Sequence, residues 1–250
     1  MAGHNKWSKV KRGKAIVDAK RGKVFSKYAR EITLAVKLGG KDSDANPRLR
    51  SALLGARAAN MPNENIDRAV KKGTGELEGA TLEEVTYEAY GPGGVALLIE
   101  CVTDNKNRAS ADVRVTCGKN GGTMGSAGSV AHLFSRIGAI KLPAAALDTE
   151  AVTDLAIEAG ADDVLTDEDE HTLITPIPQL YAAASFLKER GLHPTSIKLD
   201  YQAATTITLT DLATARAVLH LYDLLDDLDD TQNVYSNFEI ADDVLLQLDT

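Results

Sequence analysis

Basic side chains are concentrated at the start of this chain, and the binding of anions is the chemistry that the sequence indicates most clearly. The first 72 residues carry 18 Lys and Arg against 6 Asp and Glu, a net charge of +12. The remaining 178 residues carry 10 against 30, a net charge of −20, so the formal total of −8 hides two opposite parts. Positive charge confined to one end is typical of a segment that binds nucleic-acid phosphates, and an acidic remainder would orient the bound polyanion. The alternatives are that the asymmetry serves only solubility, or that the two ends pair internally.

A helix is the predicted support for a stripe of these cations. The segment Lys20–Leu38 contains no Pro and a single Gly, near its start. At about 100° per residue, Phe25, Tyr28 and Ile32 share an apolar face, which makes them core residues first. Five cations lie within about 100° on the opposite side, where like charges repel each other and favour an external partner. They are Lys20, Lys23, Lys27, Arg30 and Lys37, with Leu34 intruding among them and Arg21 lying to one side.

A second basic segment, Lys6–Lys14, precedes this helix and contains the single Trp of the chain. Trp7 could stack on a base or pack on a helical core. No arrangement of Asn, Gln or Arg points to particular base edges, so we expect contacts with the backbone and with nucleic-acid shape. The predicted nucleic-acid-binding residues are Lys6, Trp7, Lys9, Lys11, Arg12, Lys14, Lys20, Arg21, Lys23, Lys27, Arg30 and Lys37.

The other chemistry-bearing residues form no catalytic constellation. The glycines of 121–128 fit neither dinucleotide nor P-loop spacing, and a flexible loop between domains explains them better. The acidic runs 167–170 and 226–230 could hold Mg²⁺, but their spacing is not that of an EF-hand and favours solvated turns. Cys101 and Cys117 are interpreted as reduced, buried residues. We expect no enzymatic activity, no metal, no cofactor and no small-molecule substrate.

A polar cluster at 104–108 is the densest outside the basic region. Helix capping accounts for Asp104 and Asn105. Lys106 and Arg108 could add a phosphate contact.

The elements that must position these residues predict an α+β multidomain protein. Asn46 is a helix cap with Pro47 at the first helical position, and a third helix ends at Gly73, which indicates a small basic helical domain over 1–76. The following residues combine strand and helix patterns, with one ββα unit before residue 135 and one βαβ unit after residue 203. Together they predict one discontinuous α/β sheet domain over 77–135 plus 203–250, whose last strand is 234–240.

The stretch 136–202 has a complete pattern of its own. Its elements follow in the order βαββαβ, which is the ferredoxin-like order. We therefore expect a second α/β domain inserted in the first and tethered by two short linkers.

Membrane association is not expected. No apolar stretch approaches the roughly 20 residues of a membrane helix. The N-terminal residues lack the apolar segment of a signal peptide, so we expect a cytoplasmic protein.

Nine blocks spread across the chain have a recognisable sequence: Met1–Trp7, Asp18–Lys23, Arg30–Ile32, Asn46–Leu49, Met61–Asn63, Tyr90–Gly94, Thr103–Arg108, Gly128–Val130 and Val234–Asn237. In these blocks the chain resembles the YebC/PmpR family. The resemblance implies a helical N-terminal domain followed by two α/β domains. It also implies a probable transcriptional regulator with DNA-binding activity, in a family that has a mitochondrial branch of translational activators and bacterial members linked to the ribosome.

The sequence therefore leaves two alternatives for the nucleic-acid partner, DNA and ribosomal RNA. A DNA-binding regulator should read base edges, usually as a symmetric dimer, yet no clear recognition helix stands out. A translation factor associated with ribosomal RNA, and with the ribosome as a further partner, would use the basic domain on RNA backbone and loops. A metal-dependent nuclease that uses the acidic runs is a distant alternative.

Overall fold

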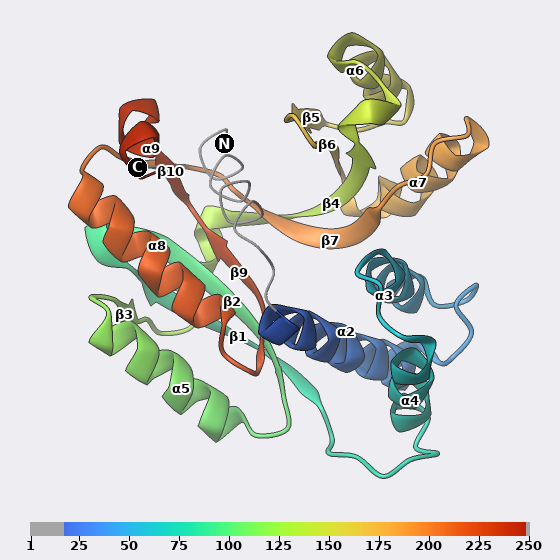
Figure 1. Cartoon of the computed structure of the whole chain (residues 1–250), viewed down its shortest axis with the longest axis horizontal. Helices are drawn as coiled ribbons and strands as arrows, with labels where there is room; N and C mark the ends of the chain where they lie inside the picture. The colour runs from blue at the N-terminus through green and yellow to red at the C-terminus, as the bar shows by residue number, and fades with distance from the viewer. Residues whose placement is uncertain (1–17, 249–250) are drawn as a thin grey trace. The chain divides into compact units, whose positions relative to one another are not determined.

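The computed structural model describes residues 18–248, with side chains from residue 21 on (Figure 1). These residues form two compact units. Unit 1 holds the described residues up to Lys27, Ala80–Ser135 and the described residues from Gln202 on, and unit 2 holds Tyr28–Gly79 and Arg136–Tyr201. The boundaries of the three domains expected from the sequence stay a prediction.

Three helices open the described chain: α2 (Asp18–Gly39), α3 (Pro47–Ala58) and α4 (Asn63–Gly73). The Asn46 side chain caps α3 by accepting the N–H of Leu49 at 3.1 Å, as its position before Pro47 predicted. Its amide also donates to the carbonyls of Ala35 and Gly40, both at 2.8 Å, so that one residue joins the end of α2 to the start of α3.

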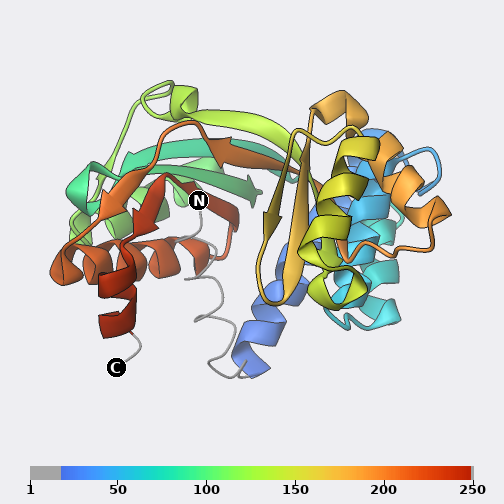
Figure 2. The same ribbon diagram turned by 90° about the horizontal axis from the view of Figure 1, so that it is seen from above.

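Unit 1 is built on a four-stranded antiparallel sheet with the order β3-β1-β2-β9. Helices α5 (Lys106–Lys119) and α8 (Leu212–Asp226) pack on it (Figure 2), and Ala109, Val113 and Cys117, which follow one another at four-residue spacing on α5, are all buried. The strands are β1 (Glu83–Tyr90), β2 (Ala96–Thr103), β3 (Thr123–Met124) and β9 (Thr231–Ser236).

The prediction of a single strand over 234–240 is wrong. The chain breaks at Asn237, and β10 (Phe238–Ile240) pairs in parallel with β8 (Ile207–Leu209) in a separate two-stranded sheet. The Asn237 side chain accepts the N–H of Ala96 at 2.8 Å, while its carbonyl accepts the N–H of Ile207 at 2.7 Å. A side-chain acceptor here replaces a backbone one, which lets the strand leave β2 and join β8. The short strand β3 and the final helix α9 (Asp242–Leu248) were not predicted.

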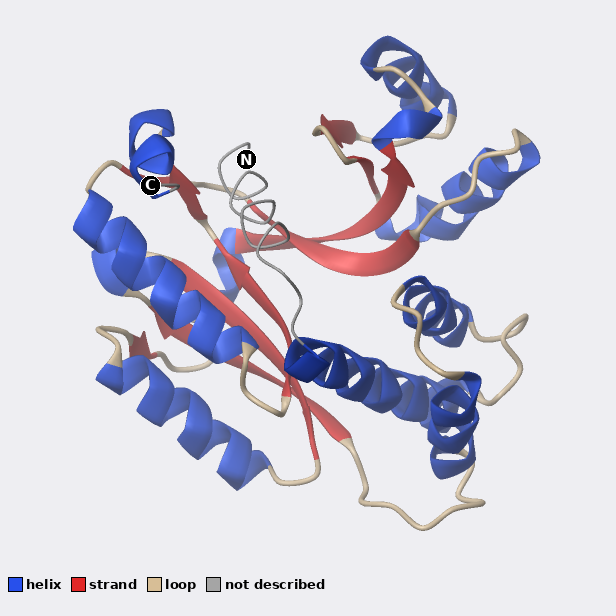
Figure 3. Cartoon of the chain, in the orientation of Figure 1, coloured by secondary structure: helices blue, strands red, loops and turns tan. Residues whose placement is uncertain are grey.

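Unit 2 contains the second sheet, whose order β5-β6-β4-β7 places β4 and β6 in the centre. Helices α6 and α7 supply the core together with this sheet. The βαββαβ succession and this order confirm the inserted ferredoxin-like domain and the α+β fold class (Figure 3). The elements are β4 (Phe134–Pro143), α6 (Thr149–Glu158), β5 (Asp163–Thr166), β6 (Glu170–Thr175), α7 (Leu180–Glu189) and β7 (Ser196–Ala203).

The insertion is not tethered by separate linkers. Strand β4 begins in unit 1 and continues into unit 2, and β7 runs from unit 2 back into unit 1. At both ends of the insertion the chain therefore passes between the units inside a regular strand. Short 3₁₀ turns complete the fold at Pro92–Gly94, Ala131–Leu133, Ala144–Ala146 and Ile177–Gln179.

Candidate nucleic-acid interface

The structure places some of the predicted nucleic-acid-binding side chains. Those of Arg21, Lys23, Lys27, Arg30 and Lys37 all lie on α2. Lys20 lies on the same helix, but its side chain is outside the described part. The predicted residues of the leading segment, Lys6, Trp7, Lys9, Lys11, Arg12 and Lys14, lie outside the described residues.

Two cations of the α2 stripe contact carboxylates of unit 1. Lys27 Nζ lies 2.7 Å from Asp226 Oδ1, and the Lys27 side chain is only 22% exposed. Lys23 Nζ lies 3.3 Å from Asp227 Oδ1 and donates to the Asp227 carbonyl at 2.9 Å. Asp226 ends α8 and Asp227 is its C-cap. For these two lysines, the internal pairing considered from the sequence is realised.

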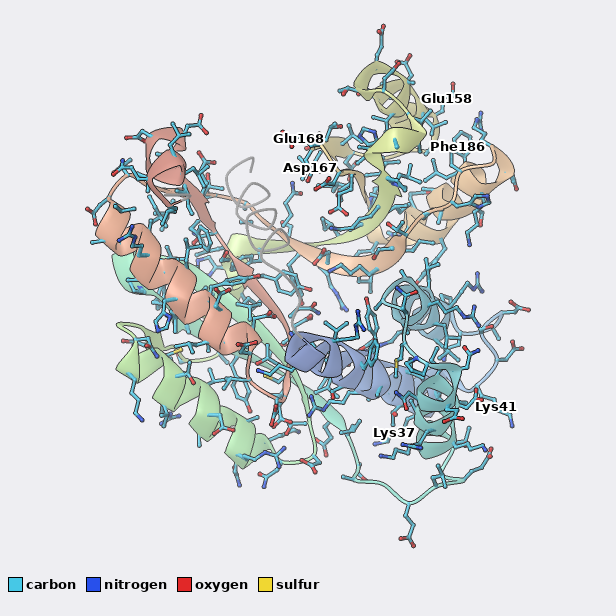
Figure 4. All side chains as sticks on the ribbon, in the orientation of Figure 1. Lys37, Lys41, Glu158, Asp167, Glu168 and Phe186 are labelled. Carbon is cyan, nitrogen blue, oxygen red and sulfur yellow. The ribbon has the colours of Figure 1, made fainter. Side chains whose placement is uncertain are left out.

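The other predicted basic residues of α2 differ in exposure along the helix. Arg21 and Lys37 are exposed and Arg30 is half-buried; Lys37 lies near the C-terminal end of α2 (Figure 4). Between them Ile32–Val36 are all buried, and Leu34 is 3% exposed. Five consecutive helical residues span about 400°, so this part of α2 is enclosed on every side. Leu34, which the helical spacing places among the cations, is therefore enclosed with its neighbours and is not part of an exposed face.

The polar cluster at 104–108 is paired within unit 1. Of the two residues that the sequence offers as caps, Asn105 caps α5, accepting the N–H groups of Asn107 and Arg108. Arg108 Nη2 donates to Asp104 at 2.7 Å and to both oxygens of Asp230, at 2.8 and 3.1 Å. These hydrogen bonds raise the pKa of Arg108 further above its usual value. Lys106 pairs with Glu83. Both cations considered as phosphate contacts therefore already have carboxylate partners.

The acidic runs and the cysteines have local roles. In the turn between β5 and β6, Asp167 accepts the N–H groups of Asp169 and Glu170 at 2.8 and 2.9 Å. Burial raises the pKa of Cys101 and of Cys117 to about 11, which keeps both as thiols near neutral pH. In the part of the chain that the structure describes, no group of three or more His, Cys, Asp or Glu side chains could hold a metal ion. None of the helices in that same part is long and apolar enough to cross a membrane.

Glu88 was not singled out from the sequence, yet it organises the loop that follows the glycine-rich stretch. Its carboxylate accepts the N–H groups of Gly128 and Val130, each at 2.6 Å, and of Ala131 at 2.8 Å. Burial by itself raises the pKa of Glu88, but these hydrogen bonds outweigh it and hold the pKa below its usual value. These hydrogen bonds fasten the chain at Gly128, the last glycine of the stretch that the sequence predicts to be a flexible loop, and directly after it. No alternation or spacing in the sequence could have identified this contact, since its partners lie about 40 residues away.

Comparison with known proteins covers almost the entire chain. The model of the TACO1/YebC protein N-terminal domain matches residues 5–76, and the model of the TACO1/YebC second and third domain matches residues 82–238. A protein of Akkermansia muciniphila is 50% identical over 250 residues, covering 99% of this chain and 100% of its own length. A protein of Opitutus terrae is 49% identical over 245 residues, covering 98% of this chain and 99% of its own length. Both are named probable transcriptional regulatory protein.

A solved structure is also similar. The crystal structure of a conserved hypothetical protein from Aquifex aeolicus matches with a TM-score of 0.86 and 45% identity, covering 92% of this chain and 94% of that one. The likeness in both sequence and fold supports the α+β multidomain architecture described above.

Proposed function

This chain belongs to the TACO1/YebC family, and we propose that it is a non-enzymatic regulator of gene expression that binds nucleic acid through its basic N-terminal region. The observation that carries the proposal is the charge division, +12 over the first 72 residues against −20 over the rest. A nucleic acid is attracted to one end of such a chain and repelled by the other. The names of the relatives support a regulatory role rather than catalysis.

Recognition would rest on the phosphate backbone. The buried run Ile32–Val36 prevents α2 from lying along a major groove over its full length. Toward the start of α2, a phosphate would have to replace Asp226 or Asp227 beside the lysines that they contact. Binding would then be an exchange of anionic partners, sensitive to salt and tolerant of sequence.

The same enclosure of α2 favours RNA as a second candidate target. Backbone and loop contacts without base-edge reading suit a translation factor that binds ribosomal RNA, acting on the ribosome in the cytoplasm. The DNA-binding transcriptional regulator and this translation factor use the same basic region, so they differ in target rather than in chemistry.

Crosslinking in cells separates the two. Ultraviolet crosslinking of the full chain, followed by sequencing of the recovered nucleic acid, should enrich DNA for a transcriptional regulator and ribosomal RNA for a translation factor. In parallel, the purified protein should bind an oligonucleotide with an affinity that falls steeply as salt rises. Recovery of neither nucleic acid, together with no binding at low salt, would refute the proposal.

A further inference from the structure

A cleft of about 210 Å³ opens in unit 2 between helices α3 and α7. This volume is small for an entire organic ligand but sufficient for a phosphate group and its neighbouring atoms. The lining is polar and basic, with two Arg, one Lys, three Ser and one Tyr. Its polar members are Ser43, Arg50, Ser51, Arg57, Tyr181, Ser185 and Lys188.

The positive charge of this cleft is not compensated locally. No Asp or Glu lines it. In the described part of the chain, neither Arg50, Arg57 nor Lys188 forms an ion pair with a carboxylate. This contrasts with Lys23 and Lys27, whose nearest anions are aspartates. Three cations around one small cleft repel each other unless an anion binds between them.

Helix α3 holds its two guanidinium groups in place. Arg50 Nε donates to the Ser43 carbonyl at 2.9 Å, and its Nη2 donates to the Asp44 carbonyl at 2.6 Å. These neutral acceptors fix the side chain and leave its charge and its other N–H groups available. Arg57 follows seven residues later, about 20° round the helix, and so lies on the same face. Leu54, between them, packs against the core of the inserted domain and orients that face toward α7.

Helix α7 carries three polar residues of the cleft lining on one of its sides. Tyr181, Ser185 and Lys188 follow at spacings of four and three residues, which places them on one side of the helix. Leu180, Ala184 and Leu187 are buried in the core and fix the orientation of the helix. Among the described residues, the hydroxyls of Tyr181 and Ser185 have no hydrogen-bond partner, so both can donate to a ligand.

We propose that the α3–α7 cleft binds a phosphate group between Arg50, Arg57 and Lys188, with the Tyr181 and Ser185 hydroxyls as further donors. Guanidinium groups suit phosphate because their planar N–H donors match its oxygens. The phosphate belongs either to a nucleic-acid backbone or to a free nucleotide. The first source rests on the proposed function, and the second does not.

The test compares the full chain with the double variant Arg57→Gln/Lys188→Gln. Both side chains are exposed, so the variant should melt within a few degrees of the parent chain. The matched control is Lys71→Gln/Lys72→Gln at the end of α4, which removes two exposed cations outside the cleft. Probes are a labelled 12-nucleotide single-stranded RNA, its DNA equivalent, uridine monophosphate and inorganic phosphate.

For a backbone phosphate, the cleft variant should bind the oligonucleotides about tenfold more weakly, with a salt slope shallower by ~0.7 for each phosphate that no longer meets a cation. The control variant should weaken binding less. If the oligonucleotides do not bind but uridine monophosphate or phosphate binds the parent and not the cleft variant, the cleft inference stands while the proposed function fails. If the oligonucleotides bind the cleft variant as tightly as the control, and neither small probe distinguishes the two, the cleft inference is overturned while the proposed function stands.

Discussion

Neutralising the carboxylates beside α2 should strengthen nucleic-acid binding. The change is Asp226→Asn/Asp227→Asn, which keeps side-chain shape and removes the anions that contact Lys27 and Lys23. Exposed ion pairs contribute about 0.2–1 kcal/mol each. The Lys27–Asp226 pair, at 2.7 Å and with side chains 22% and 31% exposed, belongs near the upper limit. The Lys23–Asp227 pair, at 3.3 Å and 45% and 57% exposed, belongs near the lower limit.

Together the two pairs amount to roughly 1.2 kcal/mol that a phosphate must overcome before it contacts these lysines. Removing them should therefore tighten binding by a factor approaching ten, since about 1.4 kcal/mol corresponds to tenfold. Removal of the same pairs should lower the free energy of unfolding by roughly 1 kcal/mol. Screening by salt should reduce both effects.

Fluorescence anisotropy with a labelled oligonucleotide at several salt concentrations measures the first effect, and urea denaturation the second. The control Asp112→Asn/Asp154→Asn raises the net charge equally at two exposed positions that form no ion pair with these lysines. If the Asp226/Asp227 variant gains no more affinity than this control, then Lys23 and Lys27 do not contact nucleic acid. The stripe predicted on α2 would then be an internally paired surface.

Three further predictions concern the stability of the fold. Glu88→Gln should lower the free energy of unfolding by about 2–3 kcal/mol, because it removes a carboxylate that accepts three backbone N–H groups. As the folded pKa of Glu88 lies below its unfolded value, its contribution is complete above about pH 4.3 and fades as the pH falls through the folded pKa. Urea melts between pH 3 and 7 should show this acid-dependent component in the parent and not in the variant; equal pH profiles would contradict the assignment. Gly55→Ala should lower the free energy of unfolding by about 1–3 kcal/mol, because the added Cβ would lie 2.6 Å from the Tyr28 ring. The control Gly118→Ala, whose Cβ would meet nothing within 4 Å, should leave the melting temperature unchanged or raise it in thermal melts. Similar melting temperatures for the two alanine variants would rule out the close approach of α3 to α2. Asn237→Ala should lower the free energy of unfolding by about 1–3 kcal/mol, because it leaves the buried N–H of Ala96 in β2 without an acceptor. Hydrogen exchange at the amide of Ala96 should become faster. Unchanged exchange at Ala96 would show that the strand break does not depend on the Asn237 side chain.

Features with local causes could be predicted from the sequence. The Asn46 and Asn105 caps are predictable because a cap and the N–H groups it accepts lie within three residues of each other. The buried row of α5 follows from its four-residue spacing. The ferredoxin-like insertion follows from the order of six elements, each with its own periodicity.

Features that depend on residues far apart in the sequence could not be predicted from it. The break at Asn237 depends on the N–H of Ala96, 141 residues earlier in the chain. Periodicity places Leu34 among the cations of α2 but does not predict its burial, because periodicity describes one helix and not the elements that surround it. The sequence does not group Arg50, Arg57 and Lys188, because nothing in their spacing shows that α3 and α7 line one cleft.

The sequence by itself determined the amount and sign of charge at each end of the chain, on which the proposed nucleic-acid partner rests. The tertiary structure decided which cations have anionic neighbours. Lys27 pairs with Asp226, 199 residues away, while Arg57 and Lys188, on different helices, share a cleft without a carboxylate. The physical reason is that Coulomb attraction depends on distance in space, which folding sets independently of separation along the chain.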